Sequence, residues 1–371
     1  MAITRLDPTR TTTLRKQYQA DMQRRFYAVR SLVIQAIWKQ DVLGLDESEP
    51  ISFNELLINA LPGRQVWRFQ TNAQKLGSFQ KWFQEQINQE ILTVDVTGNP
   101  WTAKYVGSSY RKGAVRAFNQ TLKERKKDGP LDFIQGMRSQ FLESSFSQPE
   151  RLSKIQFLYT RSFEELKGIT DAMSQQVGRR LADGLSQGKG ARAIARDLSN
   201  NITGITKQRA RVLARTELIA AHAEGQLDSF EDLNVEEVGV MAEWSTVGDD
   251  RVCELCEDLE GAIMTIDEAR GLIPRHPNCR CAWIPANVGE RSKKEMYKAR
   301  GETQDKIDES LKAELPNKTR AGVRVPQTVG EGIKRSRWAG KDLGSQYQIE
   351  FSDKLPRDFT LDDLEKAIGE K

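Results

Sequence analysis

Histidine and cysteine are scarce in this chain, whose 371 residues include two histidines and four cysteines. Long apolar runs are lacking too, because no stretch approaches the roughly 20 residues that cross a bilayer, so we expect no membrane-spanning helix and no membrane partner. The opening residues, MAITRLDPTR, lack the apolar core of a signal peptide. We therefore expect a protein that is made and kept in a reducing cytoplasm, where clustered cysteines more often bind metal than form disulfides.

All four cysteines nevertheless fall between Trp244 and Pro285, together with one of the two histidines. Zinc in proteins prefers four tetrahedral ligands drawn from cysteine and histidine. Two pairs have the two-residue spacing of a zinc knuckle, and one further thiol follows. The five candidate ligands are Cys253, Cys256, His276, Cys279 and Cys281. Their spacing predicts a structural zinc ion, with five candidates for four positions.

The completion of this ligand set is a choice between His276 and Cys281. Three cysteines with His276 would leave the zinc site with one negative charge, whereas four cysteines would leave it with two. Residues 217–268 contain sixteen acidic residues and one basic residue, so additional negative charge is unfavourable there. This balance mildly favours the set that includes His276.

Other interpretations of this window compete with structural zinc. A disulfide is disfavoured by the reducing compartment, a Cys–His nucleophile lacks a recognisable third residue, and a metal-free turn with packed thiols stays open. A catalytic zinc would need an open position and a nearby base. Asp249, Asp250 and Glu254 are available as bases but carry little weight among so many acids. The second histidine, His222, lies among alanines in a predicted helix, and we expect it on the helix surface.

Apolar residues at three- and four-residue spacing predict a helical first half. The predicted helices span residues 11–40, 74–92, 103–127, 152–185, 191–198 and 207–232, with Asn200 and Asn201 ending the fifth. Alternation then predicts a strand over 235–246, which leads into the cysteine window, and shorter strands over 263–265 and 281–284. Beyond these strands, 293–315 and a segment beginning at Thr360 are predicted helices, and 316–344 are predicted loops.

The fold class that these patterns predict is α+β, with a mainly helical N-terminal half, a small zinc-stapled β unit and a polar C-terminal tail. We expect a helical N-terminal region over 1–130, a domain with the Cys/His site over 131–288, and a partly basic tail over 289–371. The turn at 128–130 marks the first boundary.

Charge is unevenly distributed, although the net charge is only +4. Residues 104–127 contain eight basic residues and one acid, residues 150–215 thirteen and six, and residues 317–341 seven and one. Basic segments can contact DNA phosphates without sequence preference, but solvated helix faces that neutralise one another explain such segments at least as often. The predicted DNA-binding residues are Lys123, Arg125, Lys126, Lys127, Lys334, Arg335 and Arg337.

The order of the motifs resembles a known family. A helix with Arg215-Thr216-Glu217, a strand ending at Trp244, D-x-R-V-C-x-x-C and H-P-N-C-R-C together resemble the Mu F-like minor head proteins of tailed phages, which include the SPP1 gp7-type head morphogenesis proteins. The resemblance covers about 175–285, and Y-R-K-G-A at 110–114 looks like the helical region ahead of that domain in relatives. The matched positions are Arg215, Glu217, Trp244, Asp250, Cys253, Cys256, His276, Pro277, Cys279 and Cys281.

The resemblance implies a low-copy head protein of the virion, located in the capsid interior and present in the host cytoplasm during assembly. It also implies association with the portal protein, contacts with other head or scaffold proteins, and a part in the packaging or delivery of double-stranded DNA. Proteins of this family are not generally known as enzymes, and the tail shows no triad, HExxH or nucleotide motif. Two alternatives stay open: a metal-dependent hydrolase or nuclease acting on phage DNA, and a plain DNA-binding protein.

Overall fold

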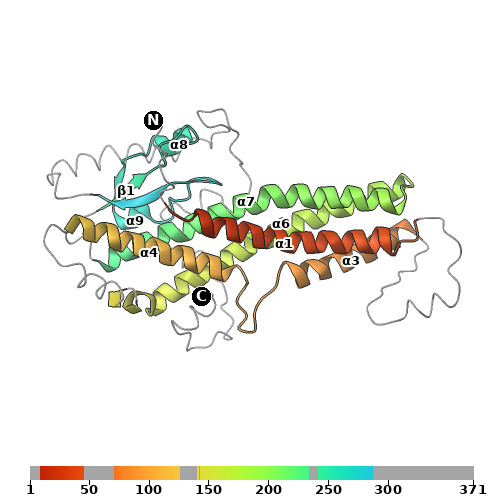
Figure 1. Ribbon diagram of the computed structural model, residues 1–371, viewed down its shortest axis with the longest axis horizontal. Coiled ribbons are helices and arrows are strands. Elements are labelled where there is room, and N and C mark those ends of the chain that lie inside the picture. The colour runs from red at the N-terminus through yellow and green to blue at the C-terminus, as the bar shows by residue number, and fades with distance from the viewer. Residues whose placement is uncertain (1–8, 46–70, 126–139, 142, 234–240, 287–371) are drawn as a thin grey trace. The chain divides into compact units, whose positions relative to one another are not determined.

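The computed structural model describes residues 9–45, 71–125, 140–141, 143–233 and 241–286, without the side chains of residues 122–125 (Figure 1). These residues divide into two compact units. Unit 1 takes its described residues from 1–18, 94–165 and 212–371, and unit 2 from 19–93 and 166–211. The predicted domain boundaries at 130 and 288 stay a prediction, and the elements predicted after residue 286 lie outside the described residues.

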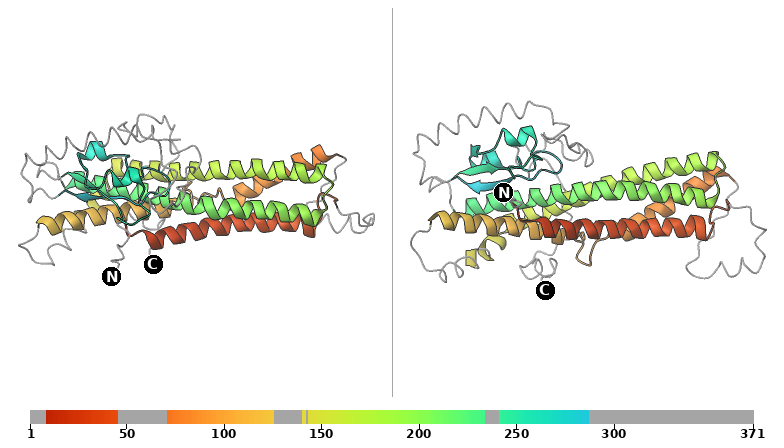
Figure 2. Two further views of the ribbon diagram at one scale, coloured as in Figure 1. Left: turned by 90° about the horizontal axis from the view of Figure 1, so that it is seen from above. Right: turned by 45° about the horizontal axis from the view of Figure 1, so that its top comes forward.

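Unit 2 consists of helices that run alongside one another (Figure 2). Its elements are α1 (Thr12–Ile34) from residue 19 on, the π-helical turn η1 (Gln35–Lys39), α3 (Asn72–Glu90), the second part of α6 (Pro149–Ser186) and the first part of α7 (Ala191–Asp232). Buried side chains recur at three- and four-residue spacing: Met22, Phe26, Val29 and Val33; Phe79, Phe83 and Ile87; Met173, Val177 and Leu181; Ile194, Leu198 and Ile202. The helices predicted over 11–40, 74–92 and 152–185 are thereby confirmed.

Helix α7 continues through the point where the sequence predicts a break. Asn200 and Asn201 lie inside this 42-residue helix and do not end it. The buried stripe passes them, from Leu198 to Ile202 and Thr206. Packing of this stripe outweighs the modest helix propensity of asparagine. The separate helices predicted over 191–198 and 207–232 are therefore wrong, and the two segments form one element.

Unit 1 contains α4 (Ala103–Arg125), which crosses α7 with the two backbones in contact. A Cβ atom on Gly113 would lie 2.0 Å from the carbonyl oxygen of His222, and one on Gly225 would lie 2.1 Å from that of Tyr110. Only glycine permits this approach from both sides. The Y-R-K-G-A segment therefore forms one half of the crossing. His222 is 1% exposed there, so its predicted place on the helix surface is wrong.

A three-stranded antiparallel sheet follows α7 in unit 1. The central strand β1 (Ala242–Ser245) pairs with β2 (Ile263–Met264) on one side and β3 (Ala282–Pro285) on the other. Trp244 lies opposite Trp283, and their rings meet edge to face with centroids 5.3 Å apart. Two one-turn helices, α8 (Glu254–Glu257) and α9 (Ile266–Ala269), lie in the connections. The predicted strands are confirmed with shifted bounds, and residues 235–240 lie outside the described residues.

The described residues thus confirm a mostly helical chain with one small antiparallel sheet, whereas the predicted tail lies beyond them. No helix within the described ranges is both long and apolar enough to cross a membrane.

Candidate metal centre

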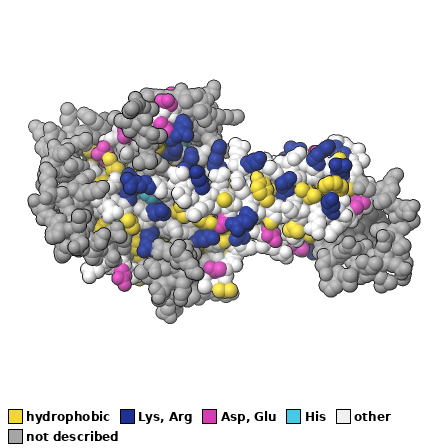
Figure 3. All heavy atoms as spheres, viewed as in Figure 1, with side chains coloured by type: hydrophobic (Ala, Val, Ile, Leu, Met, Phe, Trp, Pro, Cys, Tyr) yellow, Lys and Arg dark blue, Asp and Glu magenta, His cyan; other side chains and the backbone are white. Residues whose placement is uncertain are grey.

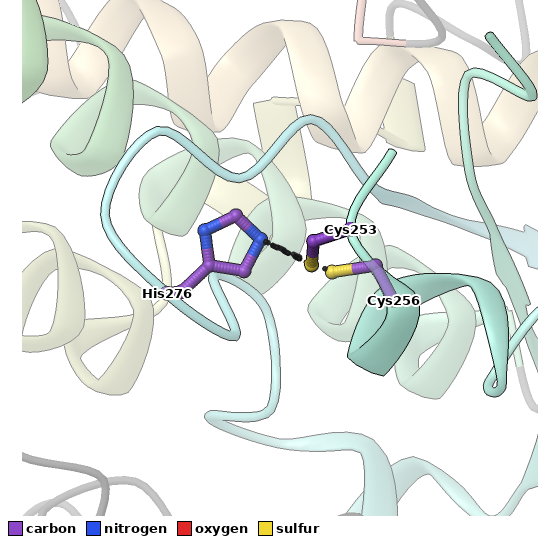
Figure 4. A group of neighbouring side chains, drawn as sticks. All are labelled: Cys253, Cys256 and His276. Atoms are coloured by element: carbon purple, nitrogen blue, oxygen red, sulfur yellow. Dashed lines mark hydrogen bonds between the residues drawn. The ribbon is translucent and has the colours of Figure 1, made fainter. Parts of the chain in front are cut away.

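The five candidate ligands come from two segments of unit 1. Cys253 is the N-cap residue of α8 and Cys256 lies within that helix, whereas the other three lie in the connection that leads into β3. All five side chains are buried. Figure 4 shows the imidazole ring of His276 directed at the two cysteines of the α8 turn.

The donor atoms form one cluster with Cys256 at its centre. His276 Nε2 lies 3.1 Å from Cys253 Sγ and 3.3 Å from Cys256 Sγ. These three donor atoms lie within 4.8 Å of one another, and so do the sulfur atoms of Cys256, Cys279 and Cys281. Because Cys256 belongs to both groups, the five residues together form a possible metal-binding site.

This donor set fits zinc. Tetrahedral zinc bonds sulfur at about 2.3 Å and imidazole nitrogen at about 2.0 Å, which places neighbouring donor atoms roughly 3.5–3.8 Å apart. The two nitrogen–sulfur distances fall slightly below that spacing, and the 4.8 Å limit lies above it. Thiolates and imidazole also suit other soft or borderline metals, so the donor set is compatible with zinc without identifying it.

The backbone sets the orientation of His276. Its Nδ1 lies 2.8 Å from the carbonyl oxygen of Pro277, which can only accept a hydrogen bond. Nδ1 therefore carries a hydrogen, and Nε2 is the ring atom that faces the thiols. Metal-bound histidines commonly donate their second ring nitrogen to a carbonyl or carboxylate in this way. The orientation of His276 is thus that of a metal ligand.

Burial and mutual contacts decide the protonation of the cluster. A hydrogen bond from Cys256, followed by the contact with His276, lowers the pKa of Cys253 to about 5 even though burial opposes this. Burial alone would lower the pKa of His276, but the hydrogen bond to Cys253 and the charges of Cys279 and Cys253 raise it to about 9. The pKa of Cys279 is likewise held well below its usual range against the effect of burial, whereas contacts with neighbouring cysteines and burial raise that of Cys256, and burial raises that of Cys281. Two of the four thiols are therefore stabilised as thiolates next to the charged His276 ring, and a bound metal cation would favour all of its thiolate ligands in the same way.

An ion pair beside the cluster joins the two ligand segments. Arg280 Nη1 donates to Asp249 Oδ2 at 2.7 Å, and Arg251 Nη2 donates to the same oxygen at 2.8 Å. These hydrogen bonds, with that from Arg280 as the largest cause, hold the pKa of Asp249 well below its usual range. Asp249 is thus engaged by two guanidinium groups and is a poor general base. The other two acids considered as bases, Asp250 and Glu254, are exposed.

Helix α7 holds the ligand segment through hydrogen bonds from its side chains to backbone groups. Asn278 N donates to Thr216 Oγ1 at 3.1 Å, and Asn278 has a left-handed φ of 68° in the H-P-N-C turn. Gln226 Nε2 donates to the carbonyl oxygen of Trp283 at 2.6 Å, and Trp283 N donates to Gln226 Oε1 at 3.2 Å. Because β3 is an edge strand, Gln226 satisfies backbone groups that would otherwise be unpaired.

Residues 175–284 match the family model described as Phage Mu protein F like protein. This segment is a Mu F-like domain. It comprises 110 of the 371 residues and includes all of α7, the sheet except Pro285, and the five candidate ligands. The resemblance to the Mu F-like head morphogenesis family is thereby confirmed. Searches of the curated proteins and of the solved structures return no match.

A buried charge network that sequence reasoning missed joins α7 of the Mu F-like domain to the first part of α6. Asp228 accepts a hydrogen bond from Lys154 at 2.6 Å and forms ion pairs of 2.7 Å with Arg151 and Arg270. Burial would raise the pKa of Asp228, but the three cations together lower it. One signal was available in the sequence: Glu224 and Asp228 are acids four residues apart on a helix otherwise rich in alanine.

The predicted DNA-binding residues lie where the structure gives no side-chain contacts. Lys123 and Arg125 belong to the last turns of α4, whose side chains are not described. The remaining five, Lys126, Lys127, Lys334, Arg335 and Arg337, lie outside the described residues. DNA binding by these residues stays a prediction.

Proposed function

We propose that this chain is a minor head protein of a tailed phage that acts in head morphogenesis in association with the portal. The observation that carries the proposal is the match of residues 175–284 to the Mu F-like family. The protein would be assembled in the host cytoplasm and reside in the capsid interior of the virion. Other head or scaffold proteins are further partners under this proposal, and double-stranded DNA is the cargo that the assembled head receives.

Assembly into heads tests this role. In cells that express the head and portal genes of its phage, a tagged chain is expected to sediment with procapsids and to co-purify with portal oligomers. The same chain expressed without the portal gene is the control for non-specific sedimentation. Portals and heads that assemble normally while the tagged chain stays in the low-density fraction would contradict the proposal.

We further propose that the metal centre holds a structural zinc ion, bound by Cys253, Cys256, His276 and one of the two remaining cysteines. The convergence of these donors and the orientation of the His276 ring support it. A bound zinc would supply a fixed cross-link between the α8 turn and the segment that leads into β3. A sheet of three strands of two to four residues has little core of its own, so such a cross-link would contribute directly to its folding.

The surroundings of the cluster support a structural rather than a catalytic ion. Five donors are present, whereas a catalytic zinc keeps one of its positions for water or substrate. The cavity beside Cys253 and His276 has a volume of about 20 Å³, close to the space of a single water molecule. A phosphodiester does not fit there. A nuclease or hydrolase function therefore gains no support from this site.

Metal analysis of the purified protein tests the zinc proposal. We expect one zinc per chain by plasma mass spectrometry, and loss of that zinc in a C253S/C256S variant. Single serine variants of Cys279 and Cys281 then identify the fourth ligand, because the variant of the spare cysteine keeps its metal. Glu254→Gln, an exposed change between the two α8 cysteines, is the matched control. Wild-type protein without stoichiometric metal would refute the proposal.

A further inference from the structure

Four cations of unit 1 pair with buried carboxylates in the interior of the fold. Arg151, Lys154 and Arg270 pair with Asp228, and Arg161 pairs with Glu217 at 2.6 Å. The side chains of these four cations are between 9% and 21% exposed. They neutralise buried carboxylates, which would otherwise be costly to leave unpaired. These cations are therefore not available to an external polyanion.

By contrast, most of the cations of unit 2 between residues 176 and 211 are exposed. This part of α6 and α7 contains eight basic residues and two acids, an excess of six positive charges in a chain whose net charge is +4. The remaining residues together carry a net charge of −2. Six of the eight basic residues are exposed: Arg179, Arg180, Arg192, Arg196, Lys207 and Arg211. Within the described part of the chain, Lys189 alone of the eight has an ion pair, with Asp197 at 3.0 Å.

An open groove lies between α6 and α7 in this basic region. Its volume is about 530 Å³, and its lining includes Arg180 from α6 together with Arg209 and three amide residues from α7. Gly204 lies in its wall, where no atom comes within 4 Å of the position that a Cβ would take. Glycine in the middle of an exposed helix costs about 0.5–1 kcal/mol relative to alanine. Here it leaves room beside the two guanidinium groups. The amide residues are Asn200, Asn201 and Gln208.

We propose that this groove and the exposed cations of α7 beside it bind the phosphate backbone of double-stranded DNA without sequence preference. Guanidinium groups and amide N–H groups are donors that phosphate oxygens accept. Asp197 is the one carboxylate that lines the groove, and Lys189 neutralises it. Lysine and arginine also predominate over acidic residues on the face drawn in Figure 3. The proposal deepens the head role stated above and rests on it for its biological meaning.

The geometry favours a duplex over a single strand. Exposed positions follow one another along α7 at 192, 196, 200, 204, 207 and 211, a straight distance of about 28 Å at 1.5 Å per residue. A duplex presents one charge per about 1.7 Å along its axis and can contact such a line throughout. Single strands are usually bound by aromatic stacking platforms, and no aromatic residue lines the groove.

Fluorescence anisotropy with a labelled duplex of about 30 base pairs tests the proposal on the full-length protein. We expect the R180Q/R209Q variant to bind at least tenfold more weakly than wild type at 0.1 M salt, and the slope of log K against log salt to fall by about two. Gly204→Leu should weaken binding without any change of charge, because the side chain fills the groove. The matched control is K16Q/K81Q, which removes two exposed lysines outside the groove and outside the basic segments named above.

The outcomes separate this proposal from its alternatives. Equal losses in R180Q/R209Q and K16Q/K81Q would overturn it, because binding would then follow total charge. Affinity for polyglutamate but not for the duplex would also overturn it and assign the groove to an acidic protein. A chain that enters heads yet has no salt-dependent duplex affinity would refute the groove while leaving the head role intact. Duplex affinity in a chain that is absent from heads would do the reverse.

Discussion

Two glycines set how closely α4 and α7 approach each other in unit 1. Gly113 lies against the backbone of His222, and Gly225 lies against that of Tyr110, so each helix supplies one glycine and one partner carbonyl. A methyl group on either side would overlap a carbonyl oxygen that belongs to a helix and cannot turn away. The close crossing of α4 and α7 therefore depends on glycine at these two positions rather than on the apolar area buried between the helices.

Substitution of Gly113 tests this dependence. Gly113→Ala places a Cβ about 2.0 Å from the His222 oxygen, and we expect a loss of about 1–3 kcal/mol in the free energy of unfolding, as for other overpacked sites. Gly168→Ala is the matched control, because nothing lies within 4 Å of that Cβ and the helix should gain about 0.5–1 kcal/mol. Urea denaturation followed by circular dichroism measures both. Equal stabilities of the two variants would show that the helices can separate at no cost.

At the scale of elements, α7 is the helix on which the Mu F-like domain is assembled. Its Thr216 and Gln226 side chains bond the backbone of the ligand segment, and its Glu224 accepts from Gly271 N at 3.2 Å. Its Asp228 gathers three cations from α6 and from the residue after α9. The buried face of α7 therefore includes polar side chains, and each of the four named here has a specific hydrogen-bond or ion-pair partner.

Removing the charge of Asp228 is expected to change how stability depends on pH. The folded-state pKa of Asp228 lies below its ordinary value, so its carboxylate stabilises the fold above about pH 4, and this contribution is lost as the pH falls toward the folded-state pKa. Asp228→Asn should cost about 3 kcal/mol near pH 7, because three buried cations lose their shared partner. The difference from wild type should shrink at low pH. Urea titrations between pH 3 and pH 7 provide the measurement.

Asp197→Asn provides the comparison for that experiment. Its ion pair with Lys189 is more than a third exposed on both sides, and pairs of this kind contribute roughly 0–1 kcal/mol. We expect a small effect of Asp197→Asn with little dependence on pH. If both variants lost the same stability at pH 7, the burial of the Asp228 network would have no energetic consequence.

For the molecule as a whole, the candidate metal ligands belong to the same core as the sheet. All four cysteines pack in one buried cluster with Trp244, Trp283 and apolar side chains of α7. The buried stripes of α1, α3 and α6 in unit 2 contain no cysteine. Loss of a metal ion should therefore affect the tryptophan pair and the sheet before it affects the helices that form unit 2.

Chelation is the corresponding experiment. Removing zinc with a strong chelator should lower the melting temperature and weaken the near-ultraviolet circular dichroism of the Trp244–Trp283 pair, with most of the far-ultraviolet helical signal retained. Adding back one equivalent of zinc should restore both. Trp283→Phe identifies the share of the aromatic signal that comes from the pair. An unchanged aromatic spectrum in metal-free protein would mean that the core needs no ion.

The elements with the strongest periodicity were predictable, and the exceptions have definite causes. The spacing of Phe79, Phe83 and Ile87 places α3 within a few residues of its observed bounds. The predicted helix end at Asn200 is wrong because the buried stripe of α7 continues along the chain beyond this residue. His222 is buried because Gly113 allows α4 to approach its backbone closely. Spacing along the sequence cannot show a contact of this kind.

The sequence by itself determined which residues are candidates for the metal site, because thiols and imidazoles in one window with knuckle spacing have few other uses. It also determined the family resemblance and the helical first half, since both depend on order and spacing along the chain. Only the tertiary structure decided that all five donors converge and that Asp228 lies buried among cations. It alone also decided that six of the eight cations between residues 176 and 211 are exposed, whereas the four cations that pair with Asp228 and Glu217 are largely buried. Burial and pairing are properties of residues distant in sequence, so no local pattern contains them.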